Sequence, residues 1–159
     1  MITTTVGNYP KIGPGVKAPN LRTALNRLDL GRISAEEAQR IEAENTKAAI
    51  DEQVAAGLDL VTDGQIGWED GQTHFARRLK GFSINGLTRY FNNNTYYRQP
   101  VVEGPVAWEG PIALQEYQFA AAHSPRPVKA IITGPYTLDR KSTRLNSSHI
   151  QKSRMPSSA

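Results

Sequence analysis

Hydrophobic positions in this chain fall into short apolar runs separated by longer stretches of mixed character. Residues 2–6, 58–62 and 128–133 are rich in β-branched and aliphatic side chains, and each run ends at polar residues and a glycine. Such runs predict buried strands, and the binding groups of a parallel sheet gather where its strands end. We therefore expect function where the runs end, above all at residues 63–70 and 133–135.

The stretches between these runs predict helices. A short helix is expected over residues 20–28, and a long alanine-rich helix should begin after Ser34 and end near Ala56. Glu37 follows Ser34 at the spacing of a capping box, which satisfies backbone donors at a helix start. Gly57 stands where a glycine commonly stops a helix.

The second half of the chain predicts a more mixed pattern. We expect a helix over residues 70–79, a hairpin formed by residues 87–91 and 95–98 between asparagine-containing turns, and a helix over residues 111–122. Strands that alternate with helices favour right-handed crossovers and a parallel sheet. The sequence therefore predicts an α/β fold.

Composition narrows the classes of function. The chain has 159 residues and no cysteine, so it offers no disulfide, no thiol nucleophile and no cysteine ligand for a metal. A complete α/β barrel typically takes about 250 residues. No apolar run reaches the roughly 18 residues of a membrane-spanning helix, and the N-terminus lacks the pattern of a signal peptide. We expect a cytoplasmic protein.

The net charge of +4 is concentrated near the C-terminus. Residues 140–159 hold five basic side chains, six serines and no acid, whereas residues 1–139 hold 14 basic and 15 acidic side chains. The main body is nearly neutral, so neither a nucleic acid nor a membrane is an expected partner. We interpret residues 1–139 as the folded domain and residues 140–159 as a foreign or disordered tail.

Five segments of the chain resemble the cobalamin-independent methionine synthase family in order and spacing. They are residues 4–10, 57–65, 79–82, 97–102 and 127–135. The resemblance implies the N-terminal part of the family's catalytic barrel. On this interpretation the fold is a partial TIM (β/α)8 barrel of about three strand–helix units with a hairpin excursion.

The resemblance also implies an activity, which is methyl transfer to the sulfur of homocysteine from a folate or a corrinoid carrier. In the family a zinc ion held by one histidine, two cysteines and a glutamate binds that sulfur. Those ligands come from later strands, so we expect none of them in this chain. We accordingly expect a fragment that is inactive alone, with no catalytic and no metal-binding residue of its own.

Substrate-binding residues follow from the same resemblance. Gly7 and Asn8 match positions that contact the amino-acid part of homocysteine, and Gln65 matches a glutamate that holds its amino group. Asp70 and Thr133 match further positions of the substrate site, although Asp70 also suits a helix cap. Glutamine keeps an acceptor oxygen but lacks the charge of glutamate.

Thr95 and Tyr96 match the positions that face the methyl donor. An arginine of the folate-dependent members is missing there, which favours a corrinoid or another donor.

Two alternative functions stay open. A decarboxylase of the uroporphyrinogen type would need arginines after the first strand, where residues 7–15 offer only Lys11. The other alternative is a small α/β binding module without catalytic activity.

Overall fold

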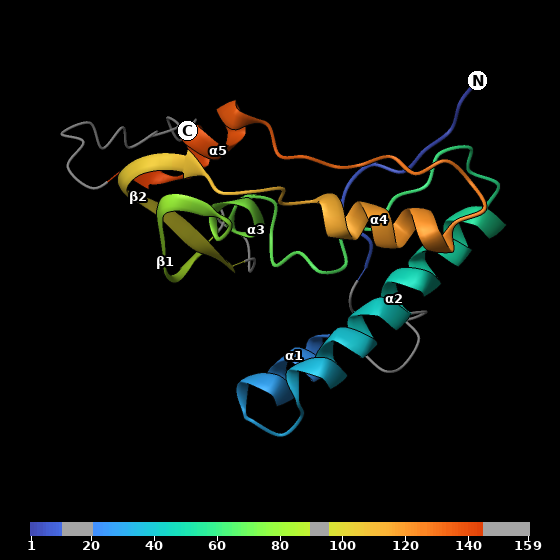
Figure 1. The fold of residues 1–159 in the computed structure, drawn as a ribbon, viewed down its shortest axis with the longest axis horizontal. Helices are drawn as coiled ribbons and strands as arrows, with labels where there is room; N and C mark the ends of the chain where they lie inside the picture. The colour runs from blue at the N-terminus through green and yellow to red at the C-terminus, as the bar shows by residue number, and fades with distance from the viewer. Residues whose placement is uncertain (11–20, 90–95, 145–159) are drawn as a thin grey trace, which may run out of the picture. The chain divides into compact units, whose positions relative to one another are not determined.

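The computed structural model describes residues 1–10, 21–89 and 96–144, which belong to two compact units (Figure 1). Unit 1 comprises Met1–Glu69 and Pro111–Ile132. Unit 2 comprises Asp70–Gly110 and the residues from Thr133 onward. Helices and strands are both present, which confirms the α/β class.

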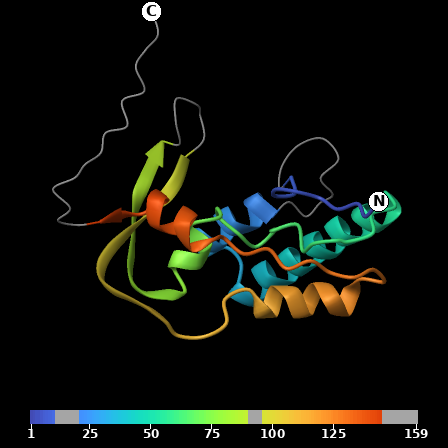
Figure 2. The same cartoon turned by 90° about the horizontal axis from the view of Figure 1, so that it is seen from above.

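Unit 1 contains the helices α1 (Leu21–Asp29), α2 (Ala35–Ala55) and α4 (Leu114–His123). The Ser34 hydroxyl accepts a hydrogen bond from the Glu37 N–H at 3.2 Å, which confirms the predicted start of α2. Gly57 follows α2 with φ +77°, as a helix stop requires. The helix α2 packs against both α1 and α4 (Figure 2).

Three extended segments of unit 1 lie side by side, and we name them the first (residues 2–6), second (58–62) and third (128–132) segments. Parallel bridges join Thr4 to Leu60 and Val61 to Val128. The parallel direction agrees with the sequence, but single bridges replace the expected continuous ladders. The second segment lies between the other two.

The core of unit 1 lies where α2 and α4 cover the second segment. Ile50, Val61 and Ala120 are each 0% exposed, and Val54 and Val128 pack against them. Full burial of an Ile or Val side chain contributes about 1.5–3 kcal/mol. A second cluster joins α1 to α2 and contains Leu21, Ala24, Ile41, Ala49 and Ile66.

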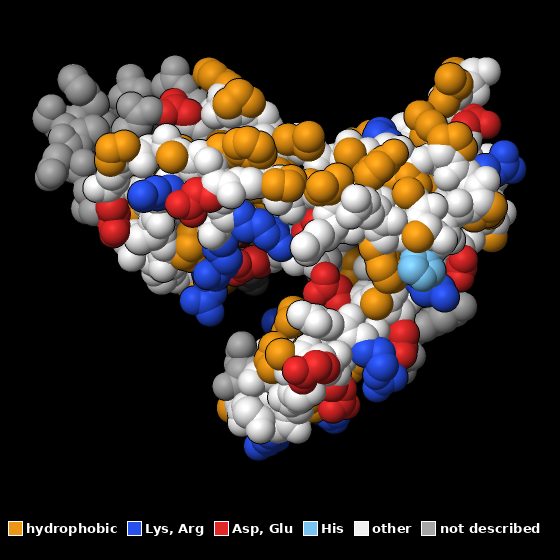
Figure 3. Space-filling view, viewed as in Figure 1, with side chains coloured by type: hydrophobic (Ala, Val, Ile, Leu, Met, Phe, Trp, Pro, Cys, Tyr) orange, Lys and Arg blue, Asp and Glu red, His pale blue; other side chains and the backbone are white. Residues whose placement is uncertain are grey.

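Surface charges on unit 1 are mixed in sign. Acidic and basic side chains are interspersed where α1 and α2 form the surface (Figure 3). The sequence of α2 nevertheless holds six acidic and two basic side chains, so the near-neutral balance of residues 1–139 is a property of the whole stretch and not of these helices.

A side-chain clamp fixes the beginning of the first segment to the second. The Thr3 N–H and hydroxyl both donate to Oδ2 of Asp59, at 2.8 and 2.9 Å, and the Asp59 N–H donates back to the Thr3 hydroxyl at 3.2 Å. These bonds stabilise the charged carboxylate. They hold the pKa of Asp59 below its ordinary value of 3.8, the backbone bond contributing most.

This clamp gives a prediction for acid stability. A carboxyl group with a lowered pKa contributes stability above its unfolded pKa, and that contribution is lost as the pH falls through the folded pKa. NMR titration of the Asp59 side chain should therefore show a midpoint below 3.8. In the variant Thr3→Val the midpoint should move only part of the way back, because the backbone bond remains. A wild-type midpoint at or above 3.8 would contradict the clamp.

Unit 2 is built around a hairpin. Its elements are α3 (Thr73–Ala76), β1 (Leu79–Arg89), β2 (Tyr96–Trp108), α5 (Pro135–Lys141) and β3 (Thr143–Arg144). β1 and β2 are antiparallel, β3 pairs in parallel with β2, and the strand order is β1-β2-β3. The register of this pairing shifts once between Lys80 and Phe82 and once between Ile84 and Leu87.

Unit 2 corrects several details of the sequence interpretation. The helix expected over residues 70–79 is only the four residues of α3, because Leu79 pairs with Trp108 in the hairpin. Asn85 and Gly86 lie inside β1 rather than in a turn before it. In unit 1, α4 begins at Leu114, three residues after Pro111.

Some expectations concern residues that the structure does not describe. The turn at residues 92–94 and most of the tail at residues 145–159 are outside the described residues. The helix α5 runs across the boundary expected between residues 139 and 140. The division into a domain and a foreign tail stays a prediction.

Candidate functional site

The loops that leave the first and second segments meet within unit 1. The Tyr9 N–H donates to the Gly64 carbonyl at 2.9 Å, which joins the loop of residues 7–10 to the loop of residues 63–68. Gly64 has φ +69°, and a Cβ placed on it would lie 3.0 Å from Cβ of Tyr9. Only glycine allows this close approach. The structure thus brings the loop of Gly7 and Asn8 next to the loop of Gln65.

Gln65 has two unusual properties. Its φ is +52°, a left-handed conformation that costs a residue with a side chain about 1–2 kcal/mol. The residue is only 7% exposed, and its buried Oε1 has no hydrogen-bond partner among the described residues. The Asp63 carboxylate accepts from the Gln65 N–H at 3.2 Å and helps to hold this conformation. Strain and an unsatisfied buried acceptor together are typical of a binding site.

Gly7 and Asn8 are exposed at the end of the first segment. Gly7 has φ +90°, and a Cβ at this position would meet nothing within 4 Å. Glycine is thus required by the turn rather than by crowding. Next to them, burial and the Glu52 carboxylate raise the pKa of Tyr9, so that hydroxyl stays protonated.

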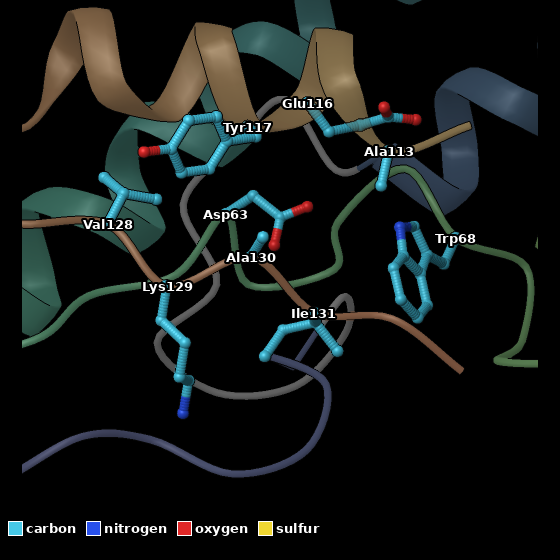
Figure 4. A pocket seen from close by; sticks show the side chains of 9 residues that line it. All are labelled: Asp63, Trp68, Ala113, Glu116, Tyr117, Val128, Lys129, Ala130 and Ile131. Atoms are coloured by element: carbon cyan, nitrogen blue, oxygen red, sulfur yellow. The ribbon is translucent and has the colours of Figure 1, made fainter. Parts of the chain in front are cut away.

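A small cavity lies beside this region (Figure 4). Its volume of about 10 Å³ is roughly that of one water molecule. Asp63 and Trp68 line it from the loop of residues 63–68. Glu116 and Tyr117 line it from α4, and Lys129 lines it from the third segment. It has no room for an amino acid, and Gln65 does not line it.

The remaining candidates belong to unit 2. The Asp70 carboxylate accepts from the N–H groups of Gln72 and Thr73, at 2.8 and 2.7 Å, and from the Thr73 hydroxyl. These bonds support the cap alternative for Asp70. The Thr133 hydroxyl donates to the Gly71 carbonyl at 2.5 Å. Tyr96 is 56% exposed at the start of β2, and Thr95 lies outside the described residues.

Sequence reasoning did not identify two polar side chains of unit 1. Gln53 of α2 is 1% exposed and binds the backbone of Thr62, and the ammonium group of Lys129 donates to the Thr5 carbonyl at 2.8 Å. A glutamine in the apolar stripe of a long helix was the available signal, since a buried amide needs partners.

Neither metal ligands nor a membrane-spanning helix emerge from the described part of the chain. No group of three or more His, Asp or Glu side chains there is arranged to hold a metal ion, and the full sequence has no cysteine. The donor set therefore does not fit a zinc site. No helix in the described ranges is long and apolar enough to cross a membrane.

The chain belongs to the family described as "Cobalamin-independent synthase, Catalytic domain", whose model matches residues 1–155. It is 34% identical over 138 residues to the methionine synthase of Sulfurisphaera tokodaii, covering 86% of this chain and 38% of that protein. It is 32% identical to the 5-methyltetrahydropteroyltriglutamate--homocysteine methyltransferase of Thermotoga maritima, covering 86% of this chain and 18% of that protein.

A solved structure agrees at the level of the fold. The B12-independent methionine synthase of Shewanella sp. W3-18-1, in complex with selenomethionine, superposes with a TM-score of 0.67 at 19% identity, covering 92% of this chain and 42% of that chain. This chain therefore spans less than half the length of these relatives. The family membership excludes the decarboxylase alternative, and the relatives' names do not support a corrinoid donor.

Proposed function

We propose that this chain carries the amino-acid-binding part of a methionine synthase catalytic barrel. On this proposal the first, second and third segments are the opening strands of a (β/α)8 barrel. The parallel bridges between them and the superposition on the Shewanella protein support it. The complete protein would transfer a methyl group from a methyltetrahydropteroyl folate to homocysteine.

Gln65 is the observation that carries the proposal. Its buried Oε1 is an acceptor without a donor among the described residues, and an ammonium group supplies such a donor. The neighbouring turn at Gly7 and Asn8 offers a backbone N–H and a side-chain amide to a carboxylate. An α-amino acid has both groups on one carbon atom, which matches two loops joined by the bond from Tyr9 to Gly64.

The other candidates complete the proposal with less support. Thr133 and Asp70 are proposed to contact the substrate, and Thr95 and Tyr96 to contact the folate. Zinc is proposed to bind through residues of the family's later strands, because the donors in this chain do not fit it.

The proposal predicts a signature for the variant Gln65→Met. Methionine keeps the length of the side chain but removes the unsatisfied acceptor, so the free energy of unfolding should rise by about 1–2 kcal/mol. Affinity for L-homocysteine should fall at least tenfold, because the ammonium group loses its acceptor. Urea denaturation and NMR titration of the ¹⁵N-labelled full chain measure the two effects.

A matched ligand provides the control. 4-Mercaptobutanoic acid is homocysteine without its amino group, and it should bind wild type and Gln65→Met with equal, weak affinity. If both ligands bind wild type equally well, Gln65 does not recognise the amino group and the proposal is wrong.

A further inference from the structure

The backbone ladder between the first and second segments stops after Leu60. The Leu60 N–H donates to the Thr3 carbonyl at 3.1 Å, as in a parallel sheet. Successive residues of a strand direct their backbone groups to opposite sides. Val61 bonds to the third segment, so Thr62 faces the first segment again. In a continuous ladder the Thr62 N–H would donate to the Thr5 carbonyl.

Two side chains occupy the places of that missing bond. The Gln53 amide accepts from the Thr62 N–H and donates to the Thr62 carbonyl, both at 2.9 Å. The Thr5 carbonyl accepts from Nζ of Lys129 at 2.8 Å. The Gln53 amide thus stands where a peptide group of the first segment would stand in a sheet. The Thr62 N–H, the Thr62 carbonyl and the Thr5 carbonyl therefore all have side-chain partners.

We propose that Gln53 and Lys129 are positioning residues that keep the first and second segments unpaired beyond Leu60. Gly7 follows Thr5 by two residues, and Gln65 follows Thr62 by three. The separation held at Thr5 and Thr62 therefore sets where the two loops diverge around the amino acid. Only the identity of the ligand, an amino acid, rests on the proposed function.

The two side chains act as a pair for a physical reason. A buried backbone group without a partner is costly, so each freed group needs its own replacement. Removing Gln53 alone leaves the Thr62 groups unsatisfied, and removing Lys129 alone leaves the Thr5 carbonyl unsatisfied. Removing both lets the Thr62 N–H bond directly to the Thr5 carbonyl, which restores the ladder.

A double-mutant cycle on the full chain tests this reasoning. We expect Gln53→Met and Lys129→Met each to destabilise the chain. The double variant should be more stable than the sum of the single effects predicts, by at least tenfold in the unfolding equilibrium constant, or about 1.4 kcal/mol. NMR coupling across hydrogen bonds should show a new bond from the Thr62 N–H to the Thr5 carbonyl in the double variant alone.

Matched variants make the cycle specific. Thr46 is another buried polar residue of α2, but its hydroxyl donates to the Glu42 carbonyl of the same helix. The effects of Thr46→Val and Lys129→Met should therefore add. Lys129→Arg keeps a donor and should restore most of the lost stability.

The outcomes separate the inference from the proposed function. The inference is overturned if the effects of the two substitutions on the unfolding free energy are additive. It is also overturned if the double variant is no more stable than Gln53→Met. In titrations with L-homocysteine the double variant should bind at least tenfold more weakly than wild type, and equal affinity overturns the positioning role. If wild type does not bind, the proposed function fails, while the stability cycle still decides whether the two side chains hold the segments apart.

Discussion

The variant Gly81→Val should lose about 4 kcal/mol of unfolding free energy in unit 2, the largest stability effect that we expect in this chain. Gly81 has φ +86°, which costs a residue with a side chain about 1–2 kcal/mol. A Cβ there would also overlap the Pro105 carbonyl oxygen, with the Pro105 carbon at 2.8 Å and the Gly104 oxygen at 2.9 Å. These are backbone atoms, so no side-chain rotation relieves the overlap.

Hydrogen exchange of the β1 and β2 amides measures this effect directly. Exchange should become several hundredfold faster in Gly81→Val, while amides of α2 in unit 1 keep their protection. Gly86 offers the matched control within the same strand, since a Cβ there meets nothing within 4 Å and its φ is not positive. Gly86→Ala should leave exchange unchanged or slower. Equal effects of both variants would show that crowding at Pro105 is not the cause.

Helix ends in unit 1 were predictable because their signals are local. Ser34 and Glu37 interact within one turn, and Gly57 needs only its own backbone freedom to stop α2. The error at residues 70–79 has the opposite origin. Leu79 has a helical partner in Phe75, but it pairs with Trp108, which lies 29 positions later in the sequence. A tertiary pairing overrides a weak local preference.

The strands were predictable in direction but not in extent. Their apolar runs and the helices between them indicate parallel neighbours, and the bridges at Leu60 and Val61 agree. The interruption beyond Leu60 depends on Gln53, which is nine positions from Thr62 and reaches it from another element. The apolar runs also failed to predict burial, because Ile2 and Val6 of the first segment are 73% and 95% exposed whereas Val61 is fully buried. Nor does periodicity report which buried polar group replaces a backbone partner.

The candidate site shows a similar division. The resemblance to a family assigned Gln65 to the amino group, but the positive φ and the unsatisfied Oε1 required coordinates. The same resemblance assigned Asp70 to the substrate, and its carboxylate accepts from the N–H groups of Gln72 and Thr73, which also suits a helix cap. A matched position therefore indicates where to look, and the hydrogen-bond partners indicate what remains available to a ligand.

The second large effect is expected for Gly64→Ala, which should act on stability and on the site together. A Cβ at Gly64 would lie 3.0 Å from Cβ of Tyr9 and 3.3 Å from Cβ of Ala49, in a backbone conformation with φ +69°. The strain and the contacts should lower the unfolding free energy by about 3 kcal/mol. Because Tyr9 belongs to the loop of Gly7, that loop must shift, and homocysteine affinity should fall at least tenfold.

Gly57→Ala separates the two causes. Gly57 has φ +77° but no atom within 4 Å of its Cβ position, so alanine there should cost only about 1 kcal/mol and leave the affinity unchanged. A readout without ligand is the exchange rate of the Tyr9 amide, which donates to the Gly64 carbonyl. Its exchange should become faster in Gly64→Ala and stay constant in Gly57→Ala. Equal acceleration in both variants would mean that backbone strain alone loosens the loop, and that the close approach of Tyr9 to Gly64 does not position it.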